Sequence, residues 1–133
     1  MITHSTLQFE TAGSFLIVLV RGQASSHDSV PILKEILAAC PAAKYTGVLV
    51  DVREQTGTLE AIDRYRNAES YGRYWPKELS VALVENAELC VQDYLFETVT
   101  SRYGVSARIF CDVKDALGWL RTREHRLQDA ATA

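Results

Sequence analysis

Apolar residues along this chain follow two kinds of spacing, one typical of strands and one typical of helices, and stretches of the two kinds alternate. Leu7 and Phe9 alternate with polar residues, which predicts a half-exposed strand at the edge of a sheet. The run Phe15–Val20 is apolar throughout, as in a strand that is covered on both faces. The turn-forming residues between these two strands predict that they pair antiparallel. Further buried strands are expected at Gly47–Val52, Leu79–Val84 and Val105–Phe110.

Between these strands the apolar residues recur every three or four positions, which predicts amphipathic helices. Gly72 and Pro76 are predicted to end the second helix, and Gly104 is predicted to end the third. We expect the four helices to begin after Ser26 or Asp28, at Thr58 or Leu59, after Asn86 and after Asp112.

The predicted order of elements is β-β-α-β-α-β-α-β-α. Strands that alternate with helices indicate an α/β fold with a mostly parallel five-stranded sheet and about four helices, in which the first strand is the antiparallel exception. With 133 residues, the chain fits a single domain. We expect the core of this domain to lie within about residues 5–121 and the C-terminal tail, 129–133, to fray.

Composition and charge argue against a nucleic-acid-binding, a secreted or a membrane-spanning protein. The net charge of -3 and the pI near 5.6 argue against a protein whose main ligand is a nucleic acid. No charged leader precedes a long apolar run, so we expect neither a signal peptide nor a membrane span. Cys40, Cys90 and Cys111 form no CxxC motif. We therefore expect a reduced, cytoplasmic protein in which these cysteines act as small apolar side chains.

The chain lacks the common signatures of cofactor and nucleotide sites. It contains no P-loop, no GxGxxG and no GxSxG. His4, His27 and His125 are scattered and share no metal-ligand spacing. We therefore expect no metal, no cofactor and no catalytic residue.

Polar residues follow the central apolar strand, at the end of the sheet where ligands and partners dock in open α/β folds. Asp51, Arg53 and Glu54 could hold a polar ligand or act as general acid and base, or they could form an ion pair that fixes the loop. Thr56 and Thr58 could contact an anion or accept a phosphate at the start of the next helix. A plain helix cap at Thr58 would explain both threonines equally well.

The second predicted helix carries two pairs of opposite charges at i,i+4 spacing, Glu60 with Arg64 and Glu69 with Arg73. Such pairs contribute only about 0.2–0.5 kcal/mol each, so they indicate a solvent-facing side of the helix.

Arginine and aromatic residues interleave near the end of the same helix. We interpret Tyr65 and Trp75 as core residues. Tyr71, Arg73 and Tyr74 could belong either to the core edge or to a partner surface, because arginine and aromatic residues are enriched at binding hot spots.

Three groups of residues resemble the SpoIIAA-like branch of the STAS superfamily: Val48-Leu49-Val50-Asp51-Val52-Arg53 with Gly57-Thr58-Leu59; Asp63-Arg64-Tyr65 with Trp75-Pro76; and Arg108-Ile109-Phe110 followed by Asp112 and Ala116-Leu117-Gly118-Trp119-Leu120. The resemblance covers about Phe15–Arg121. It implies a fold shared with anti-sigma-factor antagonists and related to the CRAL-TRIO lipid-transfer domains. In the antagonists, a partner kinase phosphorylates a serine or threonine within an Asp-Ser-Ser-Gly pattern. This chain has Thr56-Gly57-Thr58 at that place, so these two threonines are the candidate phosphorylation sites.

Three hypotheses about function follow. The first is a non-enzymatic binding domain whose protein partner, or second copy in a self-dimer, contacts Asp51, Arg53, Glu54, Thr56, Thr58, Arg73 and Tyr74. The second is a carrier of a small apolar ligand or lipid, held in a cleft between helices Leu59–Tyr74 and Ala87–Tyr103. The third is an enzyme that uses Asp51 and Arg53.

Overall fold

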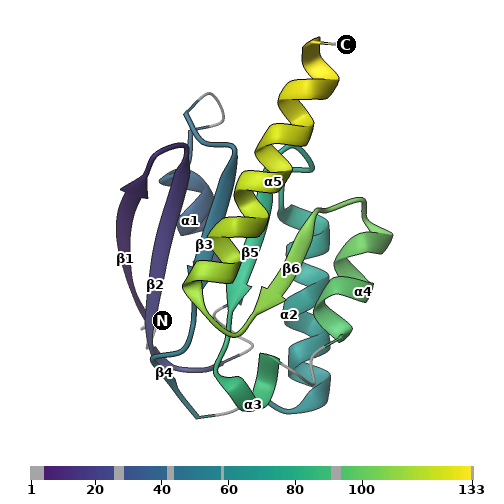
Figure 1. Ribbon diagram of the computed structural model, residues 1–133. Coiled ribbons are helices and arrows are strands. Elements are labelled where there is room, and N and C mark those ends of the chain that lie inside the picture. The colour runs from purple at the N-terminus through teal and green to yellow at the C-terminus, as the bar shows by residue number, and fades with distance from the viewer. Residues whose placement is uncertain (1–4, 26–28, 42–43, 58, 91–93, 133) are drawn as a thin grey trace.

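The computed structural model describes residues 5–25, 29–41, 44–57, 59–90 and 94–132 (Figure 1). The strands are β1 (Ser5–Ala12), β2 (Phe15–Gln23), β3 (Gly47–Asp51), β4 (Gln55–Thr56), β5 (Ser80–Val84) and β6 (Ala107–Phe110). They form one sheet with the strand order β1-β2-β3-β5-β6, and the short β4 pairs with the end of β2. β1 is antiparallel to β2 and the other pairs are parallel, which confirms the predicted fold class.

Helices cover both faces of the sheet (Figure 1). α1, α2 and α4 pack on one face, and among the described residues α5 is the helix that crosses the other. The helices are α1 (Ser29–Ala38), α2 (Ala61–Tyr74), α3 (Ala87–Cys90), α4 (Leu95–Arg102) and α5 (Val113–Thr132). None of the helices in the described ranges is long and apolar enough to cross a membrane.

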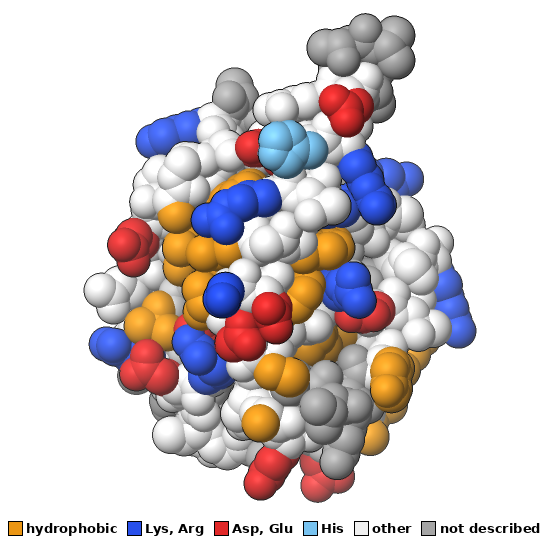
Figure 2. Space-filling view, in the orientation of Figure 1, with side chains coloured by type: hydrophobic (Ala, Val, Ile, Leu, Met, Phe, Trp, Pro, Cys, Tyr) orange, Lys and Arg blue, Asp and Glu red, His pale blue; other side chains and the backbone are white. Residues whose placement is uncertain are grey.

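The single helix α5 leaves part of its side of the sheet half-covered. Leu49 and Ala82 of the sheet are buried in one cluster with Leu120 of α5, whereas Ile17 of β2 and Leu117 of α5 are only half-buried. Figure 2 shows apolar side chains along both sides of this helix, mixed with charged residues. α5 continues to Thr132, so the tail that we expected to fray is helical as far as that residue.

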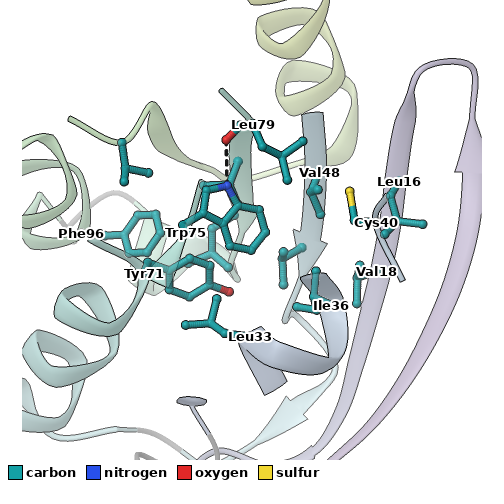
Figure 3. Close-up of a cluster of buried hydrophobic side chains, with 14 of the residues drawn as sticks. Leu16, Val18, Leu33, Ile36, Cys40, Val48, Tyr71, Trp75, Leu79 and Phe96 are labelled. Carbon is teal, nitrogen blue, oxygen red and sulfur yellow. Dashed lines mark hydrogen bonds between the residues drawn. The ribbon is translucent and has the colours of Figure 1, made fainter. Parts of the chain in front are cut away.

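The opposite face holds the larger core (Figure 3). Tyr71 and Phe96 meet edge to face with ring centroids 5.1 Å apart, and Tyr71 also packs on Trp75 at 5.4 Å. The indole nitrogen of Trp75 donates a buried hydrogen bond of 2.7 Å to the carbonyl of Leu79. The interpretation of Trp75 as a core residue is therefore confirmed, and Tyr71, which the sequence left open, also belongs to the core.

Gly72 does not end a helix, as the sequence led us to expect, but lies inside α2. A Cβ atom at this position would lie 2.3 Å from Cδ2 of Tyr103, which follows α4. The glycine is therefore needed for the close approach of α2 to Tyr103, and the helix ends at Tyr74 with Trp75 in extended conformation.

Two other predictions about local structure were wrong. The helix expected at 87–103 is divided into α3 and α4, with residues 91–93 outside the described part of the chain. Apolar spacing did not reveal the division, because Leu89 and Phe96 still match one helical face. Cys111 is disulfide-bonded, and only Cys40 is a free, buried cysteine among the described residues. Spacing along the chain cannot show which cysteines the fold brings together.

Candidate functional site

The segment between β3 and α2 forms a loop at the carboxyl ends of the parallel strands. Its first residue is tied to the sheet, since Val52 N–H donates to the carbonyl of Val84 at 3.0 Å. Its middle forms β4, where the N–H of Ala24 donates to the carbonyl of Thr56 at 2.9 Å. The loop is therefore held between β5 on one side and the end of β2 on the other.

Asp51 and Arg53 form a bidentate ion pair at the start of this loop. Nε of Arg53 donates to Oδ1 of Asp51 at 3.0 Å and Nη2 donates to Oδ2 at 2.8 Å, while the backbone N–H of Arg53 adds a third bond of 3.1 Å. Burial by itself would raise the pKa of Asp51, but the hydrogen bonds and the charge of Arg53 outweigh it and hold that pKa below its ordinary value. Both side chains are thereby engaged in fixing the loop.

Glu54 and Thr56 lie on the exposed side of the loop. Glu54 pairs with Arg21 at 3.5 Å, and both side chains are 54% exposed, so the pair contributes little to stability. The hydroxyl of Thr56 donates to the carbonyl of Gly22 at 3.3 Å. Thr58 lies outside the described residues. The N-cap of α2 is Glu60, which makes no side-chain capping bond.

Arg73 and Tyr74 do not share a local site with the loop. They lie at the far end of α2, about 18 Å along the helix axis from its first residue, Ala61. Tyr74 is exposed, and Arg73 pairs with Glu69 at 3.9 Å. A hydrogen bond from Arg73 to Tyr103 is the main reason that the pKa of this guanidinium is raised. The predicted set of binding residues is thus divided into two surfaces.

Two adjoining hollows of about 70 and 60 Å³ lie beneath the loop. Gln55 and Leu59 of the loop, Asn67 of α2 and Glu85 at the end of β5 line both hollows. One hollow extends to Tyr71 and to Ser25 and Ser29, and the other extends to Arg64, Asn86 and Phe96.

Sequence reasoning missed the polar groups of this cavity. Arg64, Asn67 and Tyr71 stand at i, i+3 and i+7, which places them on one face of α2. A stripe of polar groups on the inward side of a helix was the signal that could have revealed them. Instead, we expected Arg64 to pair with Glu60, and this ion pair is not found within the described part of the chain.

The electrostatics of the cavity combine a cation with a carboxylate. Nε of Arg64 is buried and has no hydrogen-bond partner in the described ranges. Tyr71 is buried, and its pKa is raised first by that burial and then by the negative charge of Glu85. Tyr71 is therefore a neutral hydrogen-bonding phenol throughout the ordinary pH range.

A lipid-sized space between α2 and α4 is not present in the described structure. The side chains of Ala68, Tyr71, Phe96 and Val99 are buried in one core cluster there (Figure 3). A larger groove of about 470 Å³ lies at the other end of the sheet, between the β1–β2 turn and α5. That groove is open and its lining includes three titratable residues, Arg121, Glu124 and His125, so it does not resemble an enclosed apolar chamber.

Among the described residues, no three His, Cys, Asp or Glu side chains are grouped so that they could hold a metal ion.

Comparison with known proteins identifies the fold. No family model matches this chain, and no curated protein sequence matches it. An anti-sigma factor antagonist from Mycobacterium paratuberculosis has a similar structure, with a TM-score of 0.61 and 17% identity over 88% of this chain and 94% of that one. An uncharacterised protein of the DUF3478 family with a SpoIIAA-like fold, from Shewanella loihica PV-4, gives a TM-score of 0.52 and 21% identity over 90% of this chain and 96% of that one. The protein therefore has a SpoIIAA-like fold.

Proposed function

We propose that this protein is a non-enzymatic regulatory domain that acts by binding another protein. The observation that carries the proposal is its structural similarity, over nearly its whole length, to an anti-sigma factor antagonist. By its name that neighbour opposes an anti-sigma factor, so the partner class proposed here is a regulatory protein of that kind.

The proposed contact surface is the exposed side of the loop after β3, represented by Glu54 and Thr56. Both side chains are exposed, and the ion pair between Arg53 and the buried Asp51 holds the start of the loop in shape. A loop that is hydrogen-bonded at its first residue and at β4 loses little conformational freedom on binding, which favours its use as a recognition surface. Thr56, on this surface, is also the described candidate for phosphorylation.

Two matched variants test where the partner binds. The loop variant carries Glu54→Ala and Thr56→Ala, and the far-end variant carries Arg73→Ala and Tyr74→Ala. Each replaces two exposed residues, so neither is expected to unfold the protein. The three proteins are immobilised and exposed to lysate of the source organism, and the bound proteins are quantified by mass spectrometry.

We expect a regulatory protein to be captured by the wild type and the far-end variant but not by the loop variant. Loss of this protein from the far-end variant alone would move the contact surface to the other end of α2. If no captured protein depends on either pair, the proposed mode of action is wrong. Light scattering of the wild type and both variants tests the self-dimer in the same way.

A further inference from the structure

The cavity beneath the loop has the composition of a ligand site rather than of a core defect. Its apolar walls come from Val52, Leu59 and Leu83, and its polar groups come from three separate elements. Core defects are usually apolar, whereas a small number of polar groups converging on an apolar hollow is typical of sites for small molecules.

Arg64 supplies the cationic side of this cavity. Its Nε is buried and makes no hydrogen bond to the described residues, and such groups in folded proteins ordinarily have a partner. The buried Nε of Arg123 also lacks a partner, but that guanidinium is anchored by its Nη2, which donates to Oγ of Ser106 at 2.8 Å. A guanidinium presents its N–H groups as a planar fork that matches a carboxylate or a phosphate, and the small size of the hollows favours the smaller group, the carboxylate.

The other polar groups exclude a simple anion as the best ligand. The carboxylate of Glu85 lines both hollows, and it would repel a second negative charge placed beside it. It would attract an ammonium or accept a hydrogen bond from a hydroxyl group. Asn67, which also lines both hollows, can donate and accept. The cavity therefore favours a ligand with a carboxylate at one end and a hydrogen-bond donor at the other.

Size sets a limit on this ligand. The two hollows measure about 70 and 60 Å³, whereas sites for drug-sized ligands measure about 300–1,000 Å³. A nucleotide or a fatty acid would not fit without a rearrangement of the loop. A molecule of about six heavy atoms would fit, with its carbon atoms against the apolar walls.

We propose that this cavity binds a short hydroxy- or amino-carboxylate, with the carboxylate on Arg64 and the hydroxyl or ammonium group facing Glu85 and Asn67. Gln55 and Leu59, which line the cavity, belong to the same loop as Glu54 and Thr56. A bound ligand would therefore contact the underside of the loop. This inference does not depend on the proposed protein partner.

Nuclear magnetic resonance of the ¹⁵N-labelled full chain tests the proposal directly, because the Nε–H of Arg64 gives its own resonance. The probes are L-lactate, L-alanine, propionate, which lacks the donor, and isopropanol, which lacks the carboxylate. Each is titrated to about 50 mM, because ligands of this size bind weakly. Arg64→Lys keeps the charge and removes the fork, and Arg66→Lys is the matched control on the same helix.

We expect L-lactate or L-alanine to shift the Arg64 and Asn67 side-chain resonances to saturation, with an affinity higher than that of propionate. Isopropanol should give no saturating shift. Affinity should fall about tenfold or more in Arg64→Lys and stay unchanged in Arg66→Lys, because charge-assisted hydrogen bonds to the fork are lost only in the first.

Three results would overturn the proposal. The first is the absence of a saturating shift with both L-lactate and L-alanine in the wild type, a measurement that requires no variant to fold. The second is equal affinity for propionate, which would remove the role of Glu85 and Asn67. The third is unchanged affinity in a folded Arg64→Lys variant, which would place the carboxylate elsewhere.

Discussion

Replacing Gly72 by alanine tests how closely α2 and the residue Tyr103 approach each other. In an exposed helix interior the change from glycine to alanine stabilises by about 1 kcal/mol, because alanine has the higher helix propensity. Here the added Cβ would lie 2.3 Å from Cδ2 and 2.9 Å from Cγ of Tyr103. Ordinary contacts begin near 3.4 Å, so the ring must move by about an ångström or more.

The ring cannot move away freely, because Cγ lies at the base of the side chain. Relief requires a rotation about χ1 or a shift of the backbone after α4. Overpacking of a well-filled core usually costs about 1–3 kcal/mol, and the short distances place Gly72→Ala at or above the upper end. After the gain in helix propensity, we expect a net loss of about 2 kcal/mol. The melting temperature should then fall by roughly 6–10 °C.

Gly118→Ala is the matched control. Gly118 lies in α5, and a Cβ atom there would meet no atom within 4 Å beyond its chain neighbours and the backbone of its own helix. This variant should be stabilised by about 0.5–1 kcal/mol. Urea unfolding followed by circular dichroism gives both free energies by linear extrapolation, provided that the slope stays constant between variants.

The free energy of unfolding should thus fall in Gly72→Ala and rise in Gly118→Ala, although the two substitutions are chemically identical. If Gly72→Ala is as stable as the wild type or more stable, the close approach of α2 to Tyr103 is refuted. A double-mutant cycle with Tyr103→Ala provides a second check. In that background the added methyl group has room, so Gly72→Ala should become neutral or stabilising.

Two further predictions concern buried polar contacts. The pKa of Asp51 is lower in the folded state than in the unfolded state, where it is about 3.9. The ion pair with Arg53 therefore stabilises the folded protein fully above about pH 3.9, and this stabilisation is lost as the pH falls through the folded pKa. The stability difference between wild type and Asp51→Asn, measured by urea unfolding from pH 7 downward, should therefore shrink below about pH 4; a constant difference would contradict this. Trp75→Phe should cost about 1–3 kcal/mol, because the carbonyl of Leu79 loses its buried donor, and a loss below about 0.5 kcal/mol would show that water replaces the indole.

Much of the fold could be predicted from the sequence, because strands and helices impose different periods on apolar residues. The run Phe15–Val20 indicated a strand covered on both faces; in the structure Leu16, Val18 and Val20 are buried on one face, whereas Ile17 and Leu19 on the other face are half-buried. Asp112 indicated the start of the last helix, and its carboxylate accepts a hydrogen bond of 2.8 Å from the N–H of Asp115. Both signals are local, so no knowledge of the tertiary structure was needed to read them.

The candidate site could be predicted only in part. The loop after β3 was located correctly, because the end of a parallel strand is marked by a change from apolar to polar residues. Arg73 and Tyr74 were grouped with it because they are near α2 in sequence, although the helix separates them from the loop by its length. β4 was not predicted, because a two-residue strand has no period of its own.

The contacts between elements that are distant in the sequence were decided only by the tertiary structure. Gly72 could have been a helix end or a packing site, and the position of Tyr103 settled which. Arg64 could have paired with Glu60 on the surface, but the fold placed it in the lining of a cavity that it shares with Glu85, at the end of β5. The sequence by itself determined the elements and their inward faces, since these depend on short-range spacing. The partners of each side chain depend on how the elements pack, and spacing along one chain does not contain that information.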